Sequence, residues 1–133
     1  MTPELTPREA LFFAGSPRER AALPLYEALR ARLLERLPDT VIEPRRTQIS
    51  FKNRHLFGWV STRPFGRAAD RPKVWLSVGF GLPYRLDSPR IAVTSEPYPN
   101  RWTHHMMVGG AVEIDGELLD WLAEAAAFAA GKC

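Results

Sequence analysis

The chain has little cysteine and no long apolar run. Its single cysteine, Cys133, is the last of 133 residues, so an internal disulfide is impossible and a reducing compartment, the cytoplasm, is expected. No stretch approaches the run of about 18 apolar residues that suggests a transmembrane helix. The N-terminal sequence MTPELTPREA is polar and proline-containing, unlike a signal peptide. We therefore expect a cytoplasmic protein with no membrane partner.

Known catalytic motifs are absent as well. The sequence contains no G-x-S-x-G, no Walker loop, no G-x-G-x-x-G and no H-E-x-x-H. Its three histidines are His55 and the adjacent pair His104 and His105. Neighbours along a strand point to opposite faces, so the pair cannot share one ligand. We expect no metal and no cofactor, and the sequence favours a protein that is not an enzyme.

Lysine is scarce, because 15 of the 18 basic residues are arginine, and the net charge is only +3. The small positive net charge weakly favours anionic partners. The excess of arginine over lysine could also result from a GC-rich genome. Arginine grips carboxylate and phosphate groups with a fixed fork of donors, so the positions of the arginines matter more than their number. The length predicts one domain over residues 1–133, with residues 1–15 as a short N-terminal helical extension.

Two segments near the N-terminus have the sequence pattern of a helix start. TPRE (residues 6–9) and SPRE (residues 16–19) each place a hydroxyl at the N-cap, proline at the first helical position and glutamate at the third. The first helix should stop before Gly15, and the second should run to Pro38 with a kink or a restart at Pro24. A third helix should begin near Asp115 and end at Gly131.

Between the second and the third of these helices, apolar residues recur at every second position, which is the spacing of a β-strand. Strands are predicted over residues 47–53, 56–62, 73–80, 91–95 and 101–108, with a sixth if residues 41–43 pair. Residues 63–72 have the composition of an exposed loop and are predicted to be the most mobile segment. The order favours an α+β fold. We expect a single antiparallel β-meander of five to six strands, with two N-terminal helices and one C-terminal helix packed on one face.

Alternation along the strands predicts a polar sheet face that no helix covers. Its members should be Gln48, Ser50, Lys52, Trp59, Trp75 and Ser77. In the last strand Trp102, His104 and Met106 share one face, whereas His105 lies on the other. The sequence leaves open which of the two histidines faces the polar side. Two proline-containing turns, residues 86–90 and 97–100, should hold neighbouring arginines in fixed positions.

Five segments together resemble a known family. They are SFK (residues 50–52), FGLP (80–83), LDSPR (86–90), RWTHH (101–105) and the acidic, leucine-rich final helix. Over residues 13–128 the chain resembles the bacterial domain of unknown function family 5655, which occurs alone or at the end of larger proteins, some described as transport or nuclease-like. The resemblance implies a shared fold, and implies that Asp87, Pro89, Arg90, Trp102 and the histidine pair belong to the family pattern. It implies no reaction and no catalytic residue.

The sequence favours a non-catalytic module that binds an anionic ligand such as nucleic acid or a nucleotide. Cationic side chains would hold phosphate, and flat rings would stack on bases. The candidate binding residues are Ser50, Lys52, Trp59, Trp75, Asp87, Arg90, Arg101, Trp102 and His104.

Three other interpretations stay open. The same aromatic surface could serve a protein-interaction or homodimerisation module. A small hydrolase could use His104 as a general base oriented by Asp87. Finally, the tryptophans could belong to the core while the arginines are merely solvated.

Overall fold

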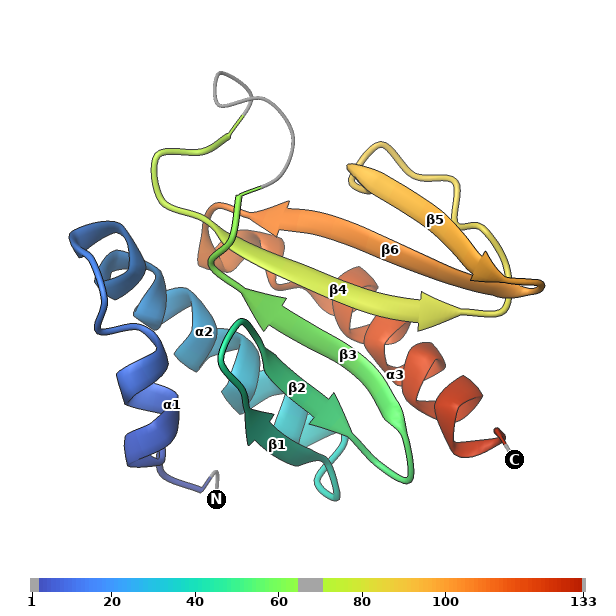
Figure 1. Cartoon of the computed structure of the whole chain (residues 1–133), viewed down its shortest axis with the longest axis horizontal. Helices are drawn as coiled ribbons and strands as arrows, with labels where there is room; N and C mark the ends of the chain where they lie inside the picture. The colour runs from blue at the N-terminus through green and yellow to red at the C-terminus, as the bar shows by residue number, and fades with distance from the viewer. Residues whose placement is uncertain (1–2, 65–70, 133) are drawn as a thin grey trace.

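The computed structural model describes residues 3–64 and 71–132, and it shows a six-stranded antiparallel sheet with helices on one face. Figure 1 shows the sheet in front of the two long helices, with the shortest helix beside its left edge. The predicted α+β class and the placement of the helices are confirmed. The elements in chain order are α1 (Pro7–Phe12), α2 (Pro17–Arg36), β1 (Val41–Pro44), β2 (Ile49–Lys52), β3 (Leu56–Ser61), β4 (Leu76–Leu82), β5 (Val93–Tyr98), β6 (Arg101–Val108), a 3-10 turn η2 (Ala111–Glu113) and α3 (Gly116–Ala130).

The helices begin where the capping sequences predict. The Thr6 side chain accepts the Glu9 N–H while the Glu9 side chain accepts the Thr6 N–H, which is a complete capping box. At the start of α2 the Ser16 side chain accepts the Glu19 N–H. The second helix continues through Pro24 as one element from Pro17 to Arg36, so it does not restart there. Burial of its apolar stripe outweighs the single backbone hydrogen bond that proline removes.

The strand order is β1-β2-β3-β4-β6-β5, so the predicted meander needs a correction at its end. Consecutive strands pair through β4, but the next neighbour of β4 is β6, and β5 forms the sheet edge. The pairing of β4 with β6 is long, from Leu76↔Val108 to Leu82↔Trp102, and it brings buried side chains together. The strand β5 is exposed and contains Pro97, which the sequence placed in a turn. Proline lacks the N–H that a central strand must donate, so this strand suits an edge.

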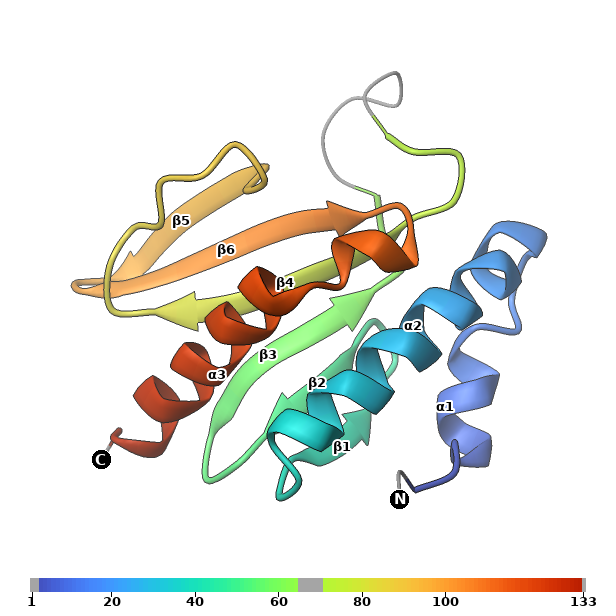
Figure 2. The same ribbon diagram turned by 180° about the vertical axis from the view of Figure 1, so that it is seen from behind.

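The core lies between the sheet and the helices α2 and α3. In the rear view of Figure 2 both helices cross the sheet, and α3 lies against β3 and β4. Alternate residues of the strands point toward this layer, which explains why every second position is apolar. The fully buried side chains include Tyr26, Leu29, Leu33, Ile49, Phe51, Val78, Phe80, Leu82, Met106, Leu118 and Leu122.

A buried ion pair joins α1 to α2. Glu9, only 1% exposed, accepts hydrogen bonds from the Tyr26 hydroxyl and from Arg30 Nε, the latter at 2.7 Å. Burial opposes the ionisation of Glu9, but the hydrogen bonds from Tyr26, the Thr6 amide and Arg30 outweigh it and lower the pKa of the carboxyl. Arg30 also donates to the carbonyl of Glu4 at 2.9 Å, which fixes the segment before α1.

Two sequence expectations fall on parts of the chain that are not described. Most of the predicted mobile loop, residues 65–70, lies outside the described residues, and so does Cys133. Among the residues that are described, no helix has the length and apolar character needed to cross a membrane.

Candidate functional site

The sheet face opposite the helices carries one row of side chains that crosses all six strands. The registers pair Glu43 with Ser50, Ser50 with Trp59, Trp59 with Gly79, and His105 with both Gly79 and Val93. Directly opposed residues of antiparallel strands point to the same side. Their sequence neighbours point toward the helices, as Gly58 shows by approaching Leu122 of α3. The row therefore lies on the open face.

The indole of Trp59 lies flat against the strands on this face. It covers Gly79 so closely that a Cβ at that position would overlap the ring atoms. The ring also meets the His105 imidazole edge-on, with 5.7 Å between centroids. The adjacent Ser50 and Ser77 are buried, and Gln48 Nε2 donates to Ser50 Oγ at 3.0 Å. Glycine at position 79 is thus what allows a large flat ring to lie against the backbone.

A hollow of about 300 Å³ opens beside this indole. Ser61 shapes its rim, because its hydroxyl donates to the Thr47 carbonyl and accepts the Arg63 N–H, both at 3.0 Å. Burial lowers the pKa of His105 below its ordinary value, which favours the neutral form of its imidazole. The hollow is lined by Thr47, Gln48, Trp59, Ser61, Arg63, Pro64, Ser77, Val93 and His105.

Four predicted site residues lie on the open face, but only Trp59 lines the hollow. Ser50 is buried beside it. The Lys52 ammonium faces Glu43, with 3.5 Å between Nζ and Oε2. Arg101 shares the open face with His105 by alternation, but it lies at the other end of β6. The sequence therefore identified the face, and it identified the aromatic floor of the hollow.

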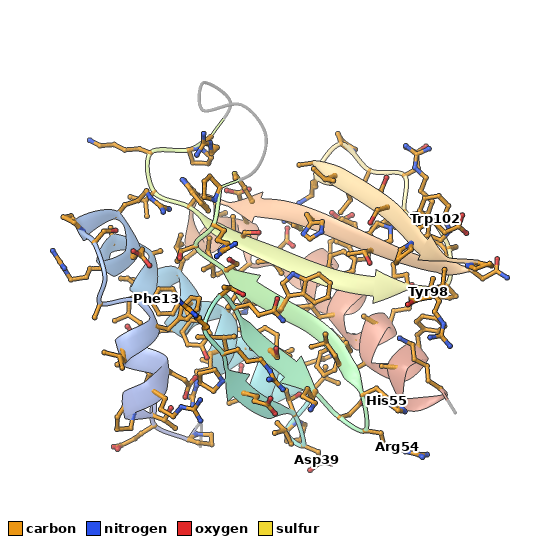
Figure 3. The ribbon with its side chains drawn as sticks, in the orientation of Figure 1. Phe13, Asp39, Arg54, His55, Tyr98 and Trp102 are labelled. Atoms are coloured by element: carbon orange, nitrogen blue, oxygen red, sulfur yellow. The ribbon has the colours of Figure 1, made fainter. Side chains whose placement is uncertain are left out.

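Two predicted residues, Trp102 and His104, lie on the helix-covered side of the sheet. They pair with Leu82 and Phe80, which are buried against the helices. Figure 3 shows Trp102 and Tyr98 at the end of the sheet where β5 and β6 join, away from the β1–β2 turn. Of the two adjacent histidines, it is His105 that faces the hollow.

The prediction that placed Trp75 on the polar open face is wrong. Its side chain is 3% exposed, and the guanidinium of Arg18 from α2 lies 4.4 Å from the centre of its ring. The strand β4 begins only at Leu76, so the alternation that assigned Trp75 to the open face does not extend to it. Trp75 packs with the start of α2 instead.

The Arg90 side chain is fully engaged by the start of α3. It donates to Asp115 at 3.0 and 3.2 Å, to Glu117 at 2.9 Å and to the Glu113 carbonyl at 2.7 Å, and it lies over the Trp121 ring. Burial would lower the pKa of Arg90, but its hydrogen bonds to Glu117 and Asp115 raise it. This guanidinium ties the β4–β5 connection to the helix terminus, where acidic side chains are favourable.

His104 is fully buried and already hydrogen-bonded. Its Nε2 accepts the Leu86 N–H at 2.9 Å, whereas Asp87, the residue expected to orient it, is exposed. The imidazole stacks on Phe80 with 5.2 Å between centroids. A general base needs a lone pair that reaches a substrate, and this one is occupied beneath the sheet. The geometry therefore gives no support to the hydrolase interpretation.

The stability of the protein should fall as the pH drops below about 6.5. Burial is the largest cause that lowers the pKa of His104, against nearby carbonyls that raise it, and burial also lowers the pKa of His105. Both groups are neutral in either state above the unfolded pKa of about 6.5, so no effect is expected there. Below it the unfolded chain binds protons first, which costs up to about 1.4 kcal/mol per pH unit for each histidine.

Urea denaturation at pH 7.5, 6.5 and 5.5 measures this dependence. His104→Phe should show a shallower decline than the unaltered protein, since one of the two titrating groups is gone. Equal stability at all three pH values would contradict the lowered pKa values of the two histidines. The pKa of Glu9 is also lowered, but the stability that its ionised form provides is lost only when the pH falls below the ordinary carboxyl value of 4.5. Glu9 therefore does not affect the three measurements.

Sequence reasoning missed most residues of the hollow. Gln48 and Ser77 were placed on the polar face without being assigned to a site, whereas Arg63 was assigned to a loop. The alternation along residues 101–108 placed His105 on the face opposite Trp102 and His104, and this pattern could have identified it as a residue of the open face. Val93 could not have been found, because it reaches the hollow only through the order of β5 and β6.

Metal ligation has no support among the residues that are described, because no three of their histidine, cysteine, aspartate or glutamate side chains come close enough to hold an ion.

The fold and the site define a class: an antiparallel sheet backed by helices, with a small polar hollow over an indole on its open face. A family model described as "Domain of unknown function (DUF5655)" matches residues 10–129, and the chain belongs to this family. The resemblance stated from the sequence is thereby confirmed. No curated protein and no solved structure matches the chain.

Proposed function

We propose that the protein binds a small anionic ligand carrying a planar ring, of the nucleotide class, in the hollow beside Trp59, and that it does so without catalysing a reaction. The observation that carries the proposal is that the aromatic residue Trp59 and the cationic residue Arg63 line the same hollow. A ring stacked on an aromatic side chain gains about 1–3 kcal/mol, and arginine binds phosphate through paired hydrogen bonds.

The size and the lining of the hollow support a small ligand. Its volume of about 300 Å³ lies at the lower end of small-molecule sites. The Thr47 and Ser77 hydroxyls and the Gln48 amide are groups that can donate or accept hydrogen bonds, which suits the edge of a base. Lys52 and Arg90 face carboxylates of their own chain, so the phosphate would depend on Arg63.

Replacing Arg63 by glutamine should weaken binding of adenosine or uridine 5′-monophosphate by about tenfold. The variant loses a charge-assisted contact, and such contacts contribute about 1.5–3 kcal/mol when they are well formed. Isothermal titration calorimetry measures the change. The corresponding nucleosides, which lack the phosphate, should bind the variant and the unaltered protein equally.

Arg101→Gln is the matched control, because this arginine shares the open face but lies outside the hollow. Its affinity for the nucleotides should change by less than about twofold. Failure of the unaltered protein to bind either nucleotide at millimolar concentration would contradict the proposal, and so would equal losses in the two variants.

A second candidate is an interaction module, for which the edge strand β5 is the specific observation. Val93 is 41% exposed and Tyr98 is 66% exposed on this strand, and an open sheet edge can pair with another chain. Light scattering, which gives the oligomeric state, and the nucleotide titration together distinguish the candidates. A concentration-independent dimer that binds no nucleotide would favour the interaction module.

A further inference from the structure

A second hollow lies between α1 and the end of β1. Its volume is about 370 Å³, and it is lined by Arg8, Leu11, Phe12, Pro44, Arg45 and Arg46. The Leu11 side chain is 72% exposed, so its apolar surface is accessible to a ligand. Arg8 Nη2 donates to the Pro44 carbonyl at 2.9 Å and so holds α1 against the strand. The hollow thus offers apolar surface bordered by guanidinium groups.

The two hollows lie on either side of one tight turn. The Arg45 N–H donates to the Gln48 carbonyl at 2.8 Å and closes the connection between β1 and β2. Arg45 and Arg46 line the second hollow, whereas the next two residues, Thr47 and Gln48, line the hollow beside Trp59. A ligand that crosses this turn would reach both hollows.

The charge at this end of the sheet is strongly positive. Among the described residues that line the two hollows, Arg8, Arg45, Arg46 and Arg63 are cationic and none carries a carboxylate. The nearby Glu43 is paired with Arg45 and Lys52. Positive potential over two adjacent hollows favours a ligand with repeated negative charges.

We propose that this end of the molecule binds a short single-stranded nucleic acid across the β1–β2 turn. One base stacks on Trp59, the backbone passes over Arg46, and a neighbouring base packs against Leu11 and Phe12. Guanidinium groups that alternate with ring or apolar surface match the alternation of phosphates and bases along a strand, whereas a peptide composed only of aspartate and glutamate has no ring to stack on the Trp59 indole. The proposal rests on the proposed function, because the first base occupies the same hollow.

Fluorescence anisotropy with labelled oligonucleotides of one, two, four and eight nucleotides tests the inference. Affinity should rise by at least tenfold between the mononucleotide and the tetranucleotide at low salt. Arg46→Gln should weaken tetranucleotide binding severalfold, reduce the slope of log K against log salt by about 0.7, and leave mononucleotide binding unchanged. Arg54→Gln is the control, because Arg54 lies at the β2–β3 turn at the other end of β2 (Figure 3).

The possible outcomes separate the two proposals. If the mononucleotide binds in an Arg63-dependent way but length adds nothing, the proposed function stands and the strand proposal is wrong. If neither mononucleotides nor oligonucleotides bind, both are wrong. If Arg46→Gln and Arg54→Gln weaken the tetranucleotide equally, the contact is diffuse and the assigned path is wrong. A polyglutamate peptide that binds as tightly as the tetranucleotide, with the same dependence on Arg46, would also overturn the strand proposal.

Discussion

Replacing Arg30 by methionine should destabilise the protein by about 3–5 kcal/mol, the largest effect that we expect from one substitution. The methionine would leave the Glu9 carboxylate buried, with only the Tyr26 hydroxyl and the Thr6 amide to compensate its charge. The carbonyl of Glu4 would lose its guanidinium donor as well. Removing one partner of a buried pair costs more than the pair contributes, because the remaining charge is desolvated without compensation. Urea denaturation followed by circular dichroism measures the loss.

The matched control is Arg36→Met, which makes the same change in the same helix. Arg36 forms an ion pair with Asp120 at 2.7 Å, but the two side chains are 45% and 66% exposed. Exposed pairs contribute about 0–1 kcal/mol, so this variant should be nearly as stable as the unaltered protein. Similar losses in both variants would show that burial of the Glu9 pair does not govern the result.

Replacing Phe80 by alanine should cost about 3–5 kcal/mol, the second large effect. The ring is fully buried and stacks on His104 at 5.2 Å and on Trp121 of α3 at 5.9 Å. The substitution removes both ring contacts and leaves a cavity between β4 and the helix, which the rigid strand cannot close. Guanidinium denaturation measures the change in the free energy of unfolding.

Tyr98→Ala is the comparison for this second prediction, because it removes another large ring from the same sheet. Tyr98 is 66% exposed on the edge strand β5, so its loss should change stability by no more than about 0.5 kcal/mol. A loss below about 1.5 kcal/mol for Phe80→Ala would contradict the placement of this ring at the centre of the core.

Local sequence patterns predicted most of the elements because each pattern reports a local physical constraint. The TPRE and SPRE sequences located the starts of α1 and α2, since capping depends on residues only three positions apart. Alternation within residues 47–53 separated the core residues Ile49 and Phe51 from Ser50. The position of β6 between β4 and β5 was missed, because pairing order depends on contacts between distant parts of the chain.

The candidate site was predicted less well than the fold, for a related reason. Alternation assigns two residues to one face, but it does not say which face the helices cover. His104 was grouped correctly with Trp102, yet that face turned out to be the covered one. Arg90 was chosen as a phosphate ligand for its charge, and only the structure reveals the carboxylates of Asp115 and Glu117 that engage it.

The most direct test of the ligand site is an NMR titration of the isotope-labelled protein with adenosine 5′-monophosphate. The account predicts that the Trp59 indole N–H and the backbone amides of Ser77 and His105 shift together, with one shared dissociation constant. The amide of Leu86 and the indole of Trp102, which lie away from the hollow, should stay in place. Shifts confined to Leu86 and Trp102, or no shifts at saturating nucleotide, would contradict the claim that the open face holds the site.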